Sequence, residues 1–450
     1  MVKLHGTAQI NEKGHLEIGG CDSTELVKEF GTPLYVMDEE LVRKNCRDYY
    51  ESFTGTYPNS QVIYASKAFM TTAMCHLVEA EGLGLDVVSG GELYTALNAK
   101  FPVERIYFHG NNKTENELRM ALDARIGRFV VDNIYEMENL NRLCLEMKTK
   151  ANILIRITPG IEAHTHEYIQ TGQIDSKFGL VMSNGQALEG IKRALEMEHL
   201  TVKGLHCHIG SQIFELESYQ HAAQVMMEFL SKVHVETGHR FEELNLGGGF
   251  GIYYISGDKP ANIKTYAALV METTKRVADE MNYPMPKVIV EPGRSIVGEA
   301  GSTLYTVGSV KNIPGVRKYV AVDGGMTDNP RPALYQARYE AVLANKINLP
   351  KNEEVSIAGK CCESGDMLIW DLHVPDVESG DILAVFCTGA YNYSMSSNYN
   401  RLLKPAVIFV KDGRADLVVK RENFEDIVRN DVVPERFKNK SGHVSAASQN

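Results

Sequence analysis

A lysine with the potential for covalent chemistry follows a short apolar run near the start of this sequence. The stretch QVIYASKAFM, residues 61–70, leads from three apolar or aromatic residues into Lys67. Many lysines in such places simply mark the point where a strand reaches water. A partly desolvated lysine, however, has a lowered pKa and can act as a nucleophile toward a carbonyl carbon. Lys67 is therefore the first candidate catalytic residue.

Other reactive side chains stand at or just after similar strand-like runs. They are Asp86, His109, His208, Ser211 and Glu291. The functional groups of a parallel barrel collect at the carboxyl ends of its strands. The recurrence of this placement predicts that these residues share one site.

Two glycine-containing segments could hold a phosphate group. LGGGFG, residues 246–251, contains Gly248 and Gly249, and EPGR offers the Gly293 backbone and the Arg294 guanidinium. Consecutive glycines expose backbone N–H groups and let a phosphate approach closely, although they also form ordinary tight turns. The run is neither a Walker sequence nor a GxGxxG fingerprint, so nucleotide binding is not favoured.

Histidine pairs raise the alternative of a metal site. His206 and His208 in LHCHIGSQ share one face of a strand, as zinc ligands do, and AHTH adds His164 and His166. Alternatively, His208 offers a flat ring for stacking on a heteroaromatic cofactor, and Ser211 can reach a phosphate oxygen. A third interpretation is a buried histidine with only a structural role, and this interpretation suits His206 better than His208.

One ligand would use all of these groups together. Pyridoxal phosphate needs a lysine for its Schiff base, a phosphate cradle, and an acidic group beside its pyridinium nitrogen. Lys67 and Glu291 meet the first and last of these needs. The cofactor ring is an electron sink, and decarboxylation is one reaction that it supports.

The elements that position these residues alternate regularly over the first 300 residues. Strand-like runs occur at residues 62–66, 85–88, 105–109, 128–132, 153–157, 204–208, 243–247 and 287–291. Helical stretches such as TENELRMALDA and SYQHAAQVMMEFLSKVHVE separate them. Eight such units predict an α/β fold with a (β/α)8 TIM barrel, and an open doubly wound sheet is the structural rival.

After residue 300 the strands follow one another with few helices, which predicts a mainly antiparallel β domain, a barrel or sandwich. We expect the (β/α)8 barrel to span residues 37–299. Residues 1–36 together with 300–435 would form the β domain. The small, polar tail 436–450 is expected to be disordered.

The composition restricts the class of protein. Hydrophobic residues make up 44% and charged residues 23%, as in soluble globular proteins. The net charge of −11 argues against a nucleic-acid surface, and neither a signal peptide nor a membrane span is evident. Eight cysteines without regular spacing suit a reducing cytoplasm better than a disulfide framework. We therefore expect a cytoplasmic protein.

Several motifs together resemble one enzyme family. They are YASKA, LDVVSGGEL, FHGNNK, HCHIGSQI, NLGGGFG, EPGRS, RPALY, CCESGD and GAYNYSMSSNYN. They resemble the diaminopimelate decarboxylases, most closely the Bacillus type, over residues 4–430. The family has an alanine-racemase-type barrel, uses pyridoxal 5'-phosphate, and converts meso-2,6-diaminopimelate to L-lysine and CO₂ at its D-centre in the last step of lysine biosynthesis.

The resemblance implies specific roles at the cofactor. Lys67 would carry the Schiff base, His208 would stack on the ring, and Glu291 would pair with the ring nitrogen. The full set assigned to cofactor binding is Lys67, Asp86, His208, Ser211, Gly248, Gly249, Glu291, Pro292, Gly293, Arg294 and Tyr391.

The resemblance also implies a substrate site and a shared dimer. Cys362 would be the proton donor, since a cysteine with a pKa near about 8.5 is largely protonated at neutral pH. The positions assigned to substrate binding are Arg294, Arg331, Tyr335, Glu363 and Tyr391. The CESGD segment would reach the active site of a partner subunit, so a homodimer is expected.

Three alternatives stay open. One is a decarboxylase of the same fold acting on D-ornithine, D-lysine or carboxynorspermidine, although RPALY and CESGD favour diaminopimelate. Another is a cofactor-carrying barrel without catalytic activity, which the β domain and Cys362 argue against. The third is a metal-dependent hydrolase, which stoichiometric zinc without pyridoxal phosphate would favour.

Overall fold

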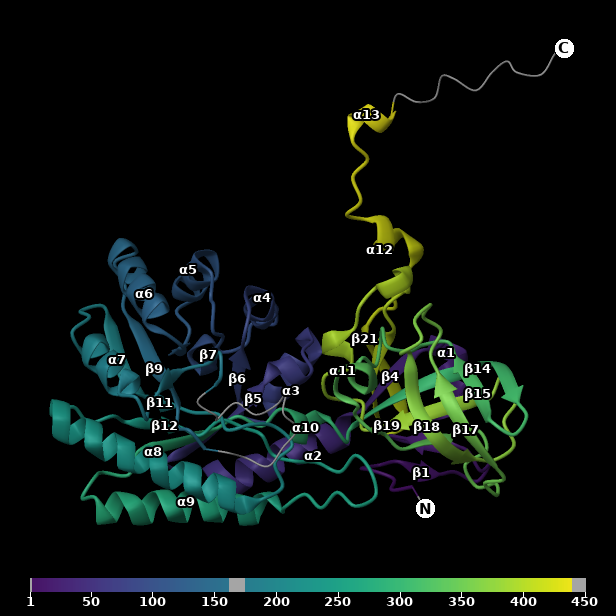
Figure 1. Ribbon diagram of the computed structural model, residues 1–450, viewed down its shortest axis with the longest axis horizontal. Helices are drawn as coiled ribbons and strands as arrows, with labels where there is room; N and C mark the ends of the chain where they lie inside the picture. The colour runs from purple at the N-terminus through teal and green to yellow at the C-terminus, as the bar shows by residue number, and fades with distance from the viewer. Residues whose placement is uncertain (1, 162–174, 439–450) are drawn as a thin grey trace.

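The structure is a computed structural model of the chain, and it describes residues 2–161 and 175–438. The predicted pair His164 and His166 lies outside these residues. A barrel wrapped by helices and a β-rich half lie beside each other (Figure 1). All eight cysteines are free, as expected without a disulfide framework. None of the helices in the described ranges is long and apolar enough to cross a membrane.

Eight parallel strands close into the predicted barrel. They are β5 (Ser60–Ala65), β6 (Gly84–Val87), β7 (Ile106–Phe108), β8 (Arg128–Val131), β9 (Ala151–Thr158), β11 (Leu200–His206), β12 (Glu243–Asn245) and β13 (Lys287–Val290). The strand β13 pairs with β5, and β8 pairs with β9. These two pairings complete the ring, so the closed barrel is confirmed and the open sheet is excluded.

Helices follow the strands in the order that the sequence predicts. They are α3 (Thr72–Ala80), α4 (Gly90–Asn98), α5 (Glu115–Ala124), α6 (Ile134–Glu146), α7 (Gln186–Leu195), α8 (Leu216–Thr237), α9 (Ile263–Glu280) and α10 (Arg294–Val297). The additional helix α2 (Glu39–Tyr50) precedes β5, and the short strand β10 (Leu180–Val181) pairs with β9. Local sequence fixes several helix starts. For α5, Thr114 accepts from the Glu117 N–H while the Glu117 side chain accepts from the Thr114 N–H, which forms a capping box.

The interior of the barrel changes from apolar to polar along its strands. Ile63, Tyr107, Val130, Leu154 and Ile289 form one buried cluster from five different strands. Side chains of a strand alternate between its two faces, so the residue two positions further points to the same interior. Two positions after Tyr107, Val130, Leu154 and Ile289, the chain carries the polar side chains His109, Asp132, Arg156 and Glu291. The same spacing therefore builds an apolar floor and a polar mouth at the carboxyl ends.

The second half is a mainly antiparallel sheet with two parallel pairings, β15–β17 and β4–β20. Its strands are β4 (Leu34–Asp38), β14 (Gly301–Ile313), β15 (Arg317–Val322), β16 (Ala341–Leu343), β17 (Glu353–Ala358), β18 (Met367–Val374), β19 (Ile382–Phe386), β20 (Ala406–Lys411) and β21 (Arg414–Val419). The short elements β1 (Gln9–Ile10), β2 (Leu16–Ile18), β3 (Cys21–Asp22) and α1 (Ser23–Phe30) precede them.

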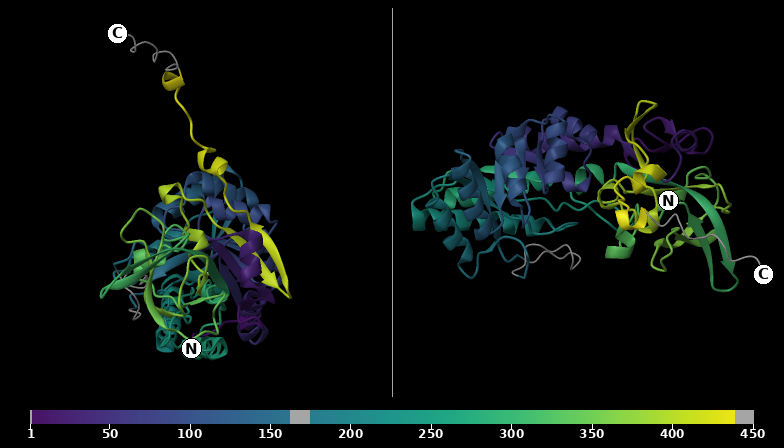
Figure 2. Two further views of the ribbon diagram at one scale, coloured as in Figure 1. Left: turned by 90° about the vertical axis from the view of Figure 1, so that its right-hand side faces the viewer. Right: turned by 90° about the horizontal axis from the view of Figure 1, so that it is seen from above.

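Three short helices complete the second half: α11 (Arg331–Tyr335), α12 (Phe424–Val428) and α13 (Glu435–Lys438). The helix α13 begins at the predicted disordered tail, and residues 439–450 lie outside the described ranges. The views in Figure 2 show the C-terminal segment leaving the body of the molecule. The division of the chain at residues 37 and 299 stays a prediction.

A buried carboxyl in the β half should make stability depend on pH. Asp328 accepts hydrogen bonds from Tyr305 Oη and from the Gly325 N–H. Burial raises the pKa of Asp328 from 3.8 to about 7, against the lowering effect of these bonds. Between these two pH values the unfolded chain has lost a proton that the folded chain keeps, so the free energy of unfolding should fall as pH rises through about 7.

Asp328→Asn should remove this contribution and flatten that pH dependence. Denaturant unfolding at several pH values between about 4 and about 8 measures it. Asp416→Asn, at an exposed position, is the control and should keep the wild-type slope. The same slope in Asp328→Asn and wild type would count against a raised pKa.

Candidate active site

A cavity of about 670 Å³ opens at the carboxyl ends of the barrel strands, within the size range of ligand sites. Its walls include residues from both halves of the fold. The structure brings together there the predicted residues Lys67, Asp86, His208, Ser211, Gly248, Gly249, Glu291, Gly293, Arg294, Arg331, Tyr335 and Tyr391. The shared location of these side chains is the geometric basis for one active site.

Lys67 lies in a single helical turn, Ser66–Ala68, immediately after β5. Two other cavity segments are joined to its neighbours. The Ala65 N–H donates to the Pro292 carbonyl at 3.0 Å, and the Tyr391 N–H donates to the Ala68 carbonyl at 2.8 Å. Lys67 itself is exposed in this single chain, although the sequence suggested a partly desolvated amine. Its amine can therefore be reached from the cavity.

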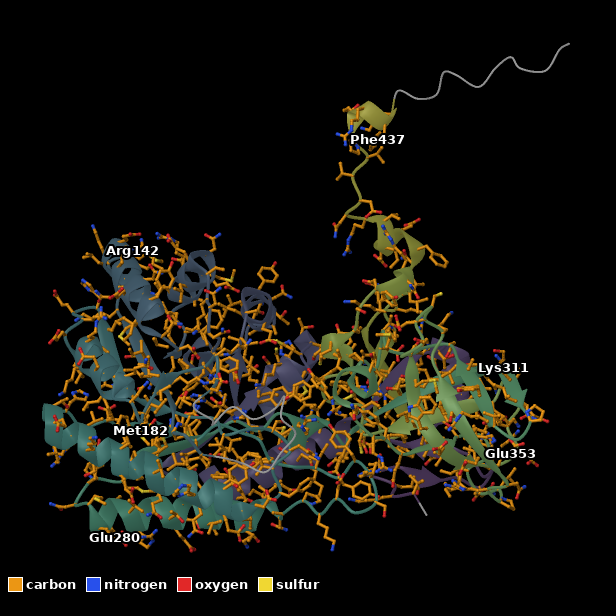
Figure 3. All side chains as sticks on the ribbon, in the orientation of Figure 1. Arg142, Met182, Glu280, Lys311, Glu353 and Phe437 are labelled. Atoms are coloured by element: carbon orange, nitrogen blue, oxygen red, sulfur yellow. The ribbon has the colours of Figure 1, made fainter. Side chains whose placement is uncertain are left out.

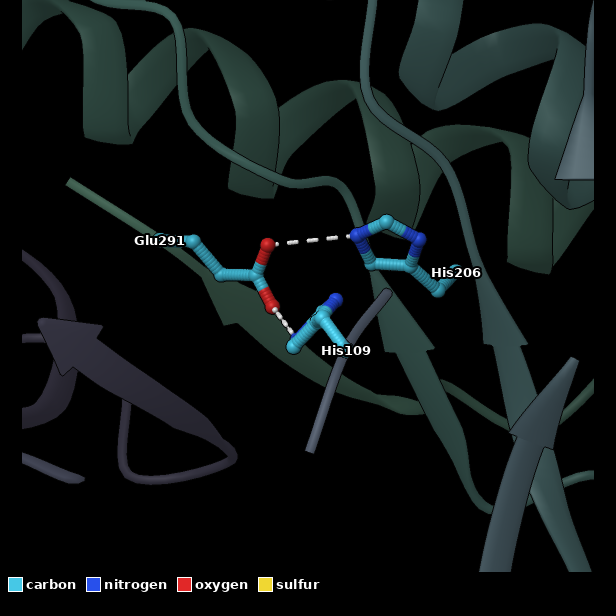
Figure 4. Close-up of side chains that lie close together, drawn as sticks. All are labelled: His109, His206 and Glu291. Atoms are coloured by element: carbon cyan, nitrogen blue, oxygen red, sulfur yellow. Dashed lines mark hydrogen bonds and ion pairs between the residues drawn. The ribbon is translucent and has the colours of Figure 1, made fainter. Parts of the chain in front are cut away.

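Glu291 is the centre of a buried polar cluster at the cavity floor (Figure 4). His109 Nε2 lies 2.9 Å from Glu291 Oε1, and His206 Nε2 lies 3.2 Å from Glu291 Oε2. Asn245 Nδ2 donates to Glu291 Oε1 at 2.7 Å. Both carboxylate oxygens are thus engaged, and the orientation of the carboxylate is fixed by three different strands or strand ends.

These contacts determine the charge of the cluster. Burial alone would raise the pKa of Glu291, but His109 and His206 hold it well below its usual range. Burial lowers the pKa of His206 to about 4, so this ring is neutral at pH 7. Burial also raises the pKa of Asp86 to about 6, with His109 opposing the shift. Glu291 is consequently an ionised carboxylate at neutral pH.

A metal ion is the alternative occupant of this cluster. One ligand atom each from His109, His206 and Glu291 lie within 4.8 Å of one another. Two nitrogens and one oxygen form a donor set that zinc accepts. The Asn245 amide, however, already donates to one oxygen of this carboxylate. The prediction that no metal binds stays a prediction, which metal analysis of the purified protein tests.

The backbone at Gly248 and Gly249 lies so close to neighbouring backbone that a residue with a side chain would not fit at either position. A Cβ on Gly248 would lie 2.1 Å from the Glu291 carbonyl oxygen, and one on Gly249 would lie 2.4 Å from the Gly210 carbonyl oxygen. Gly249 also has a φ of +110°, which disfavours other residues. The Gly248 N–H points to His208 Nδ1 at 3.2 Å. These glycines bring backbone close to the cavity, as a phosphate site requires.

His208 and Arg294 complete this side of the cavity. Burial, together with the positive charges of Lys67 and Arg156, lowers the pKa of His208 well below its usual range, which favours a neutral ring. Arg294 Nη2 donates to Ser211 Oγ at 2.9 Å. Arg294 Nε is buried and has no hydrogen-bond partner among the described residues. The guanidinium therefore retains a donor for an anionic group.

Two tyrosines that the sequence analysis missed hold the arginines in place. Arg294 Nη1 donates to Tyr254 Oη at 2.7 Å, and the Arg331 guanidinium lies 4.9 Å from the Tyr254 ring centre. Arg331 Nη1 donates to Tyr339 Oη at 2.5 Å. The Tyr254 and Tyr339 rings meet edge to face at 5.5 Å. Tyr254 thus orients both guanidinium groups, and the Arg294 guanidinium also lies 4.8 Å from the Tyr391 ring centre.

Tyr254→Phe should lower kcat/KM about 10- to 100-fold, because a hydrogen bond to a charged group contributes roughly 1.5–3 kcal/mol. Most of the change should appear in KM if Arg294 orients the substrate in the ground state. Steady-state kinetics measure it. The control is Tyr253→Phe at the next position, which does not line the cavity and should leave kcat/KM unchanged. Equal kinetics for both variants would contradict the role of Tyr254.

Three predicted residues do not line the cavity of their own chain: the buried Pro292, whose carbonyl accepts from the Ala65 N–H, and the pair Cys362 and Glu363. Cys362 and Glu363 are exposed and do not line it. The Cys362 N–H donates to Asn400 Oδ1 at 2.7 Å, and the Gly365 N–H donates to Glu363 Oε1 at 3.2 Å. In one chain these side chains are therefore separate from the other assigned residues, and their predicted service to a partner subunit stays a prediction.

Other residues of the site could have been found only partly from the sequence. Asn245 stands two positions before Gly247 in β12, so strand alternation predicts that it points inward. Arg156 follows from the same rule in β9 and lines the cavity. Tyr254 and Tyr339 lie outside the barrel strands, and no periodicity reveals them.

Comparison with known proteins identifies the class that this fold and site define. A family model described as pyridoxal-dependent decarboxylase, pyridoxal binding domain, matches residues 40–298. The match covers more than half of the chain and the whole ring of barrel strands. The chain is therefore a member of the pyridoxal-dependent decarboxylases.

Individual relatives narrow this class. The diaminopimelate decarboxylase of Bacillus subtilis is 56% identical over 429 residues, which are 95% of this chain and 98% of the relative. A crystal structure of the M. jannaschii diaminopimelate decarboxylase with L-lysine has a TM-score of 0.89 at 39% identity, covering 96% and 98% of the two chains. The Helicobacter pylori enzyme with L-lysine has a TM-score of 0.83 at 32% identity, covering 91% and 98%. This chain belongs to the diaminopimelate decarboxylase family.

Proposed function

We propose that this protein removes CO₂ from the D-centre of meso-2,6-diaminopimelate and releases L-lysine, using pyridoxal 5'-phosphate. The observation that carries the proposal is the meeting of Lys67, the ionised Glu291 and the Gly248–Gly249 cradle around one cavity. These are the groups that an aldehyde, a pyridine nitrogen and a phosphate require. The family relationship supports the choice of substrate.

The residues present fit the cofactor. Lys67 Nζ would bind its aldehyde carbon, and the neutral His208 ring offers a stacking surface. The backbone of Gly248, Gly249 and Gly293 would hold the phosphate, with help from Ser211 and the free Arg294 Nε. When bound, the cofactor supplies a ring that accepts the electron pair released as the bond between Cα and the carboxylate breaks.

Glu291 controls the protonation of that ring. Its carboxylate stays ionised at neutral pH because of His109 and His206. An ionised carboxylate favours a proton on the facing ring nitrogen, and a protonated nitrogen makes the ring a better electron acceptor. His206, Asn245 and His109 act as positioning residues, since they fix the direction of the carboxylate.

The substrate carries a second amino-acid end that must be bound at a distance from the reacting carbon. Arg331 can bind the distal carboxylate with its planar fork. It lies in the cavity, with Tyr254 and Tyr339 beside it. Tyr335 and Tyr391 line the same region. Arg294 is placed to contact both the cofactor and the substrate.

Two assigned residues would come from the partner of a homodimer. Glu363 would bind the distal ammonium group, and Cys362 Sγ would donate the proton that replaces CO₂ at Cα. Both are exposed in the single chain, as residues of a shared site must be before assembly. The eight free cysteines support a reducing compartment, for which we propose the cytoplasm.

The direct test is incubation of the purified protein with meso-diaminopimelate and, separately, with D-lysine or D-ornithine, measuring CO₂ and the amine products. We expect L-lysine and CO₂ in equal amounts from meso-diaminopimelate. Turnover of D-lysine alone would reject the proposed substrate and leave the fold assignment intact. Stoichiometric zinc without pyridoxal phosphate in the same preparation would favour the metal-dependent alternative.

A further inference from the structure

The last described residues of the chain form an arm whose large apolar side chains are exposed in their own chain. We define the C-terminal arm as residues 422–438, which contain α12 and α13. None of its residues is buried. The arm projects away from the rest of the molecule, and Figure 3 labels Phe437 in α13, well separated from the body.

The arm nevertheless carries a row of large apolar side chains. Their exposed fractions are 80% for Phe424, 54% for Val428, 87% for Val432, 57% for Val433 and 54% for Phe437. Exposed single apolar residues are common, but a cluster of this kind on one segment marks an interaction surface. Helices of four and five residues are also too short to be stable alone in water. The arm therefore needs a partner surface.

The root of the arm is fixed rather than loose. Arg401 Nη1 donates to the Ile427 carbonyl at 2.9 Å, and Arg401 Nη2 lies 2.9 Å from Asp431 Oδ2. Asn398 Nδ2 donates to Glu422 Oε2 at 2.6 Å. These contacts set the direction in which the arm leaves the body, so its apolar residues are presented at a defined place.

The same root segment holds the predicted proton donor. Asn400 Oδ1 accepts from the Cys362 N–H at 2.7 Å, and Asn400 is followed directly by Arg401. Both residues have positive φ values, 51° and 58°. Non-glycine residues adopt this conformation mainly where the surrounding structure requires it. One segment thus connects the arm with Cys362, and both are exposed for contact with another molecule.

The charge and the apolar side chains of the arm indicate which kind of partner it binds. Residues 422–438 contain five acidic and three basic side chains, so the arm has no excess of positive charge to attract a nucleic acid or an anionic membrane. An apolar surface without a positive charge excess is suited to another protein. Its connection to the Cys362 segment points to the same partner that the proposed shared site requires, which is a second copy of this chain.

We propose that the C-terminal arm packs on a second copy of this chain and holds Cys362 at that copy's active site through the segment 398–404. This inference rests on the proposed homodimer. The barrel helices α4 to α6 lie on the side of the molecule toward which the arm projects, as Figures 1 and 2 show. The exposed Tyr94 of α4 and Tyr135 of α6, with exposed fractions of 65% and 69%, are the contacts that we propose for the arm on the second copy.

The test compares two double variants of the full chain by sedimentation velocity over a range of concentrations. Phe424→Asp with Val432→Asp places charges on the arm, and we expect the dimer dissociation constant to rise at least about tenfold. Val235→Asp with Val316→Asp is the control, at similarly exposed valines elsewhere, by 82% and 74%. It should dimerise within about twofold of wild type. Activity of the arm variant should return at high protein concentration, which also shows that it folds.

Cross-linking gives a second measurement that needs no substitution. Dimers assembled from isotopically light and heavy chains should give cross-links from Lys438 of one chain to the barrel of the other. A wild-type monomer would overturn both the homodimer and the arm. A wild-type dimer that the arm variant leaves unchanged, with Lys438 cross-links only inside one chain, would overturn the arm alone.

Discussion

Lys67→Ala and Cys362→Ala proteins should each lose nearly all activity, and a mixture of the two should regain about a quarter of the wild-type activity. The reason is that Lys67 lines its own chain's cavity, whereas Cys362 lies outside it. Random exchange of subunits makes half of the dimers mixed, and each mixed dimer contains one intact site out of two. Each single variant should lose on the order of 10²–10⁴ in kcat, the range for a lost proton-transferring group.

The measurement is decarboxylation after the two proteins have been mixed under conditions that exchange subunits. Exchange itself is followed by mass spectrometry of isotopically labelled chains. The control is a mixture of Lys67→Ala and Glu291→Gln proteins, which should stay inactive. Both residues line their own chain's cavity, so each cavity of a mixed dimer still carries one defect. Verified exchange without recovery for Lys67→Ala and Cys362→Ala would show that the sites are not shared.

Glu291→Gln should lower kcat by about 10²–10³, the usual effect of removing one preorganised electrostatic group. The amide keeps the size of the side chain but has no negative charge to keep the ring nitrogen protonated. The amide also has one acceptor oxygen in place of two, so it cannot accept hydrogen bonds at both of the positions that Asn245 and His206 contact. The measurement is kcat divided by the cofactor content of each preparation. This ratio distinguishes a slower reaction from a loss of bound cofactor.

Glu243→Gln is the matched control for this substitution. Glu243 is also buried on a barrel strand, but it stands at the start of β12 and pairs with Arg128 rather than with cavity residues. Its replacement should affect stability and leave kcat per folded molecule unchanged. A Glu291→Gln enzyme with the wild-type kcat would contradict the role assigned to the carboxylate.

The barrel could be predicted from the sequence because its strands and helices alternate with little interruption. All eight predicted runs correspond to strands, with ends that differ by a few residues. After residue 300 the sequence predicts strands at 303–310, 318–325, 354–359, 381–387, 406–410 and 416–420, and it misses β16 and β18. The strand β18 has only Leu368 and Val374 buried and carries Trp370, which is exposed, so its pattern does not read as a core strand. Strands with one face in solvent have fewer consecutive hydrophobic residues than barrel strands that are buried on both faces, so they are harder to recognise in the sequence.

The site could be predicted in part for the same physical reason. Lys67 and Glu291 follow strands and Asp86 lies near the end of β6, and a closed barrel brings the ends of its strands together independently of the loops. Tyr254 and Tyr339 act through side chains from segments far apart in sequence, so only the folded chain reveals their contacts with the arginines. Cys362 lies outside its own chain's cavity, and in the proposed homodimer its role would depend on a second molecule, about which the periodicity of one chain carries no information.

The central claim is that Lys67 binds the cofactor covalently. Borohydride reduction of the protein loaded with pyridoxal phosphate makes such a link permanent, and digestion followed by mass spectrometry locates the modified residue. We predict one modification per chain, on the peptide that contains Lys67. A modification on another lysine, or none in protein that retains the cofactor, would contradict the account.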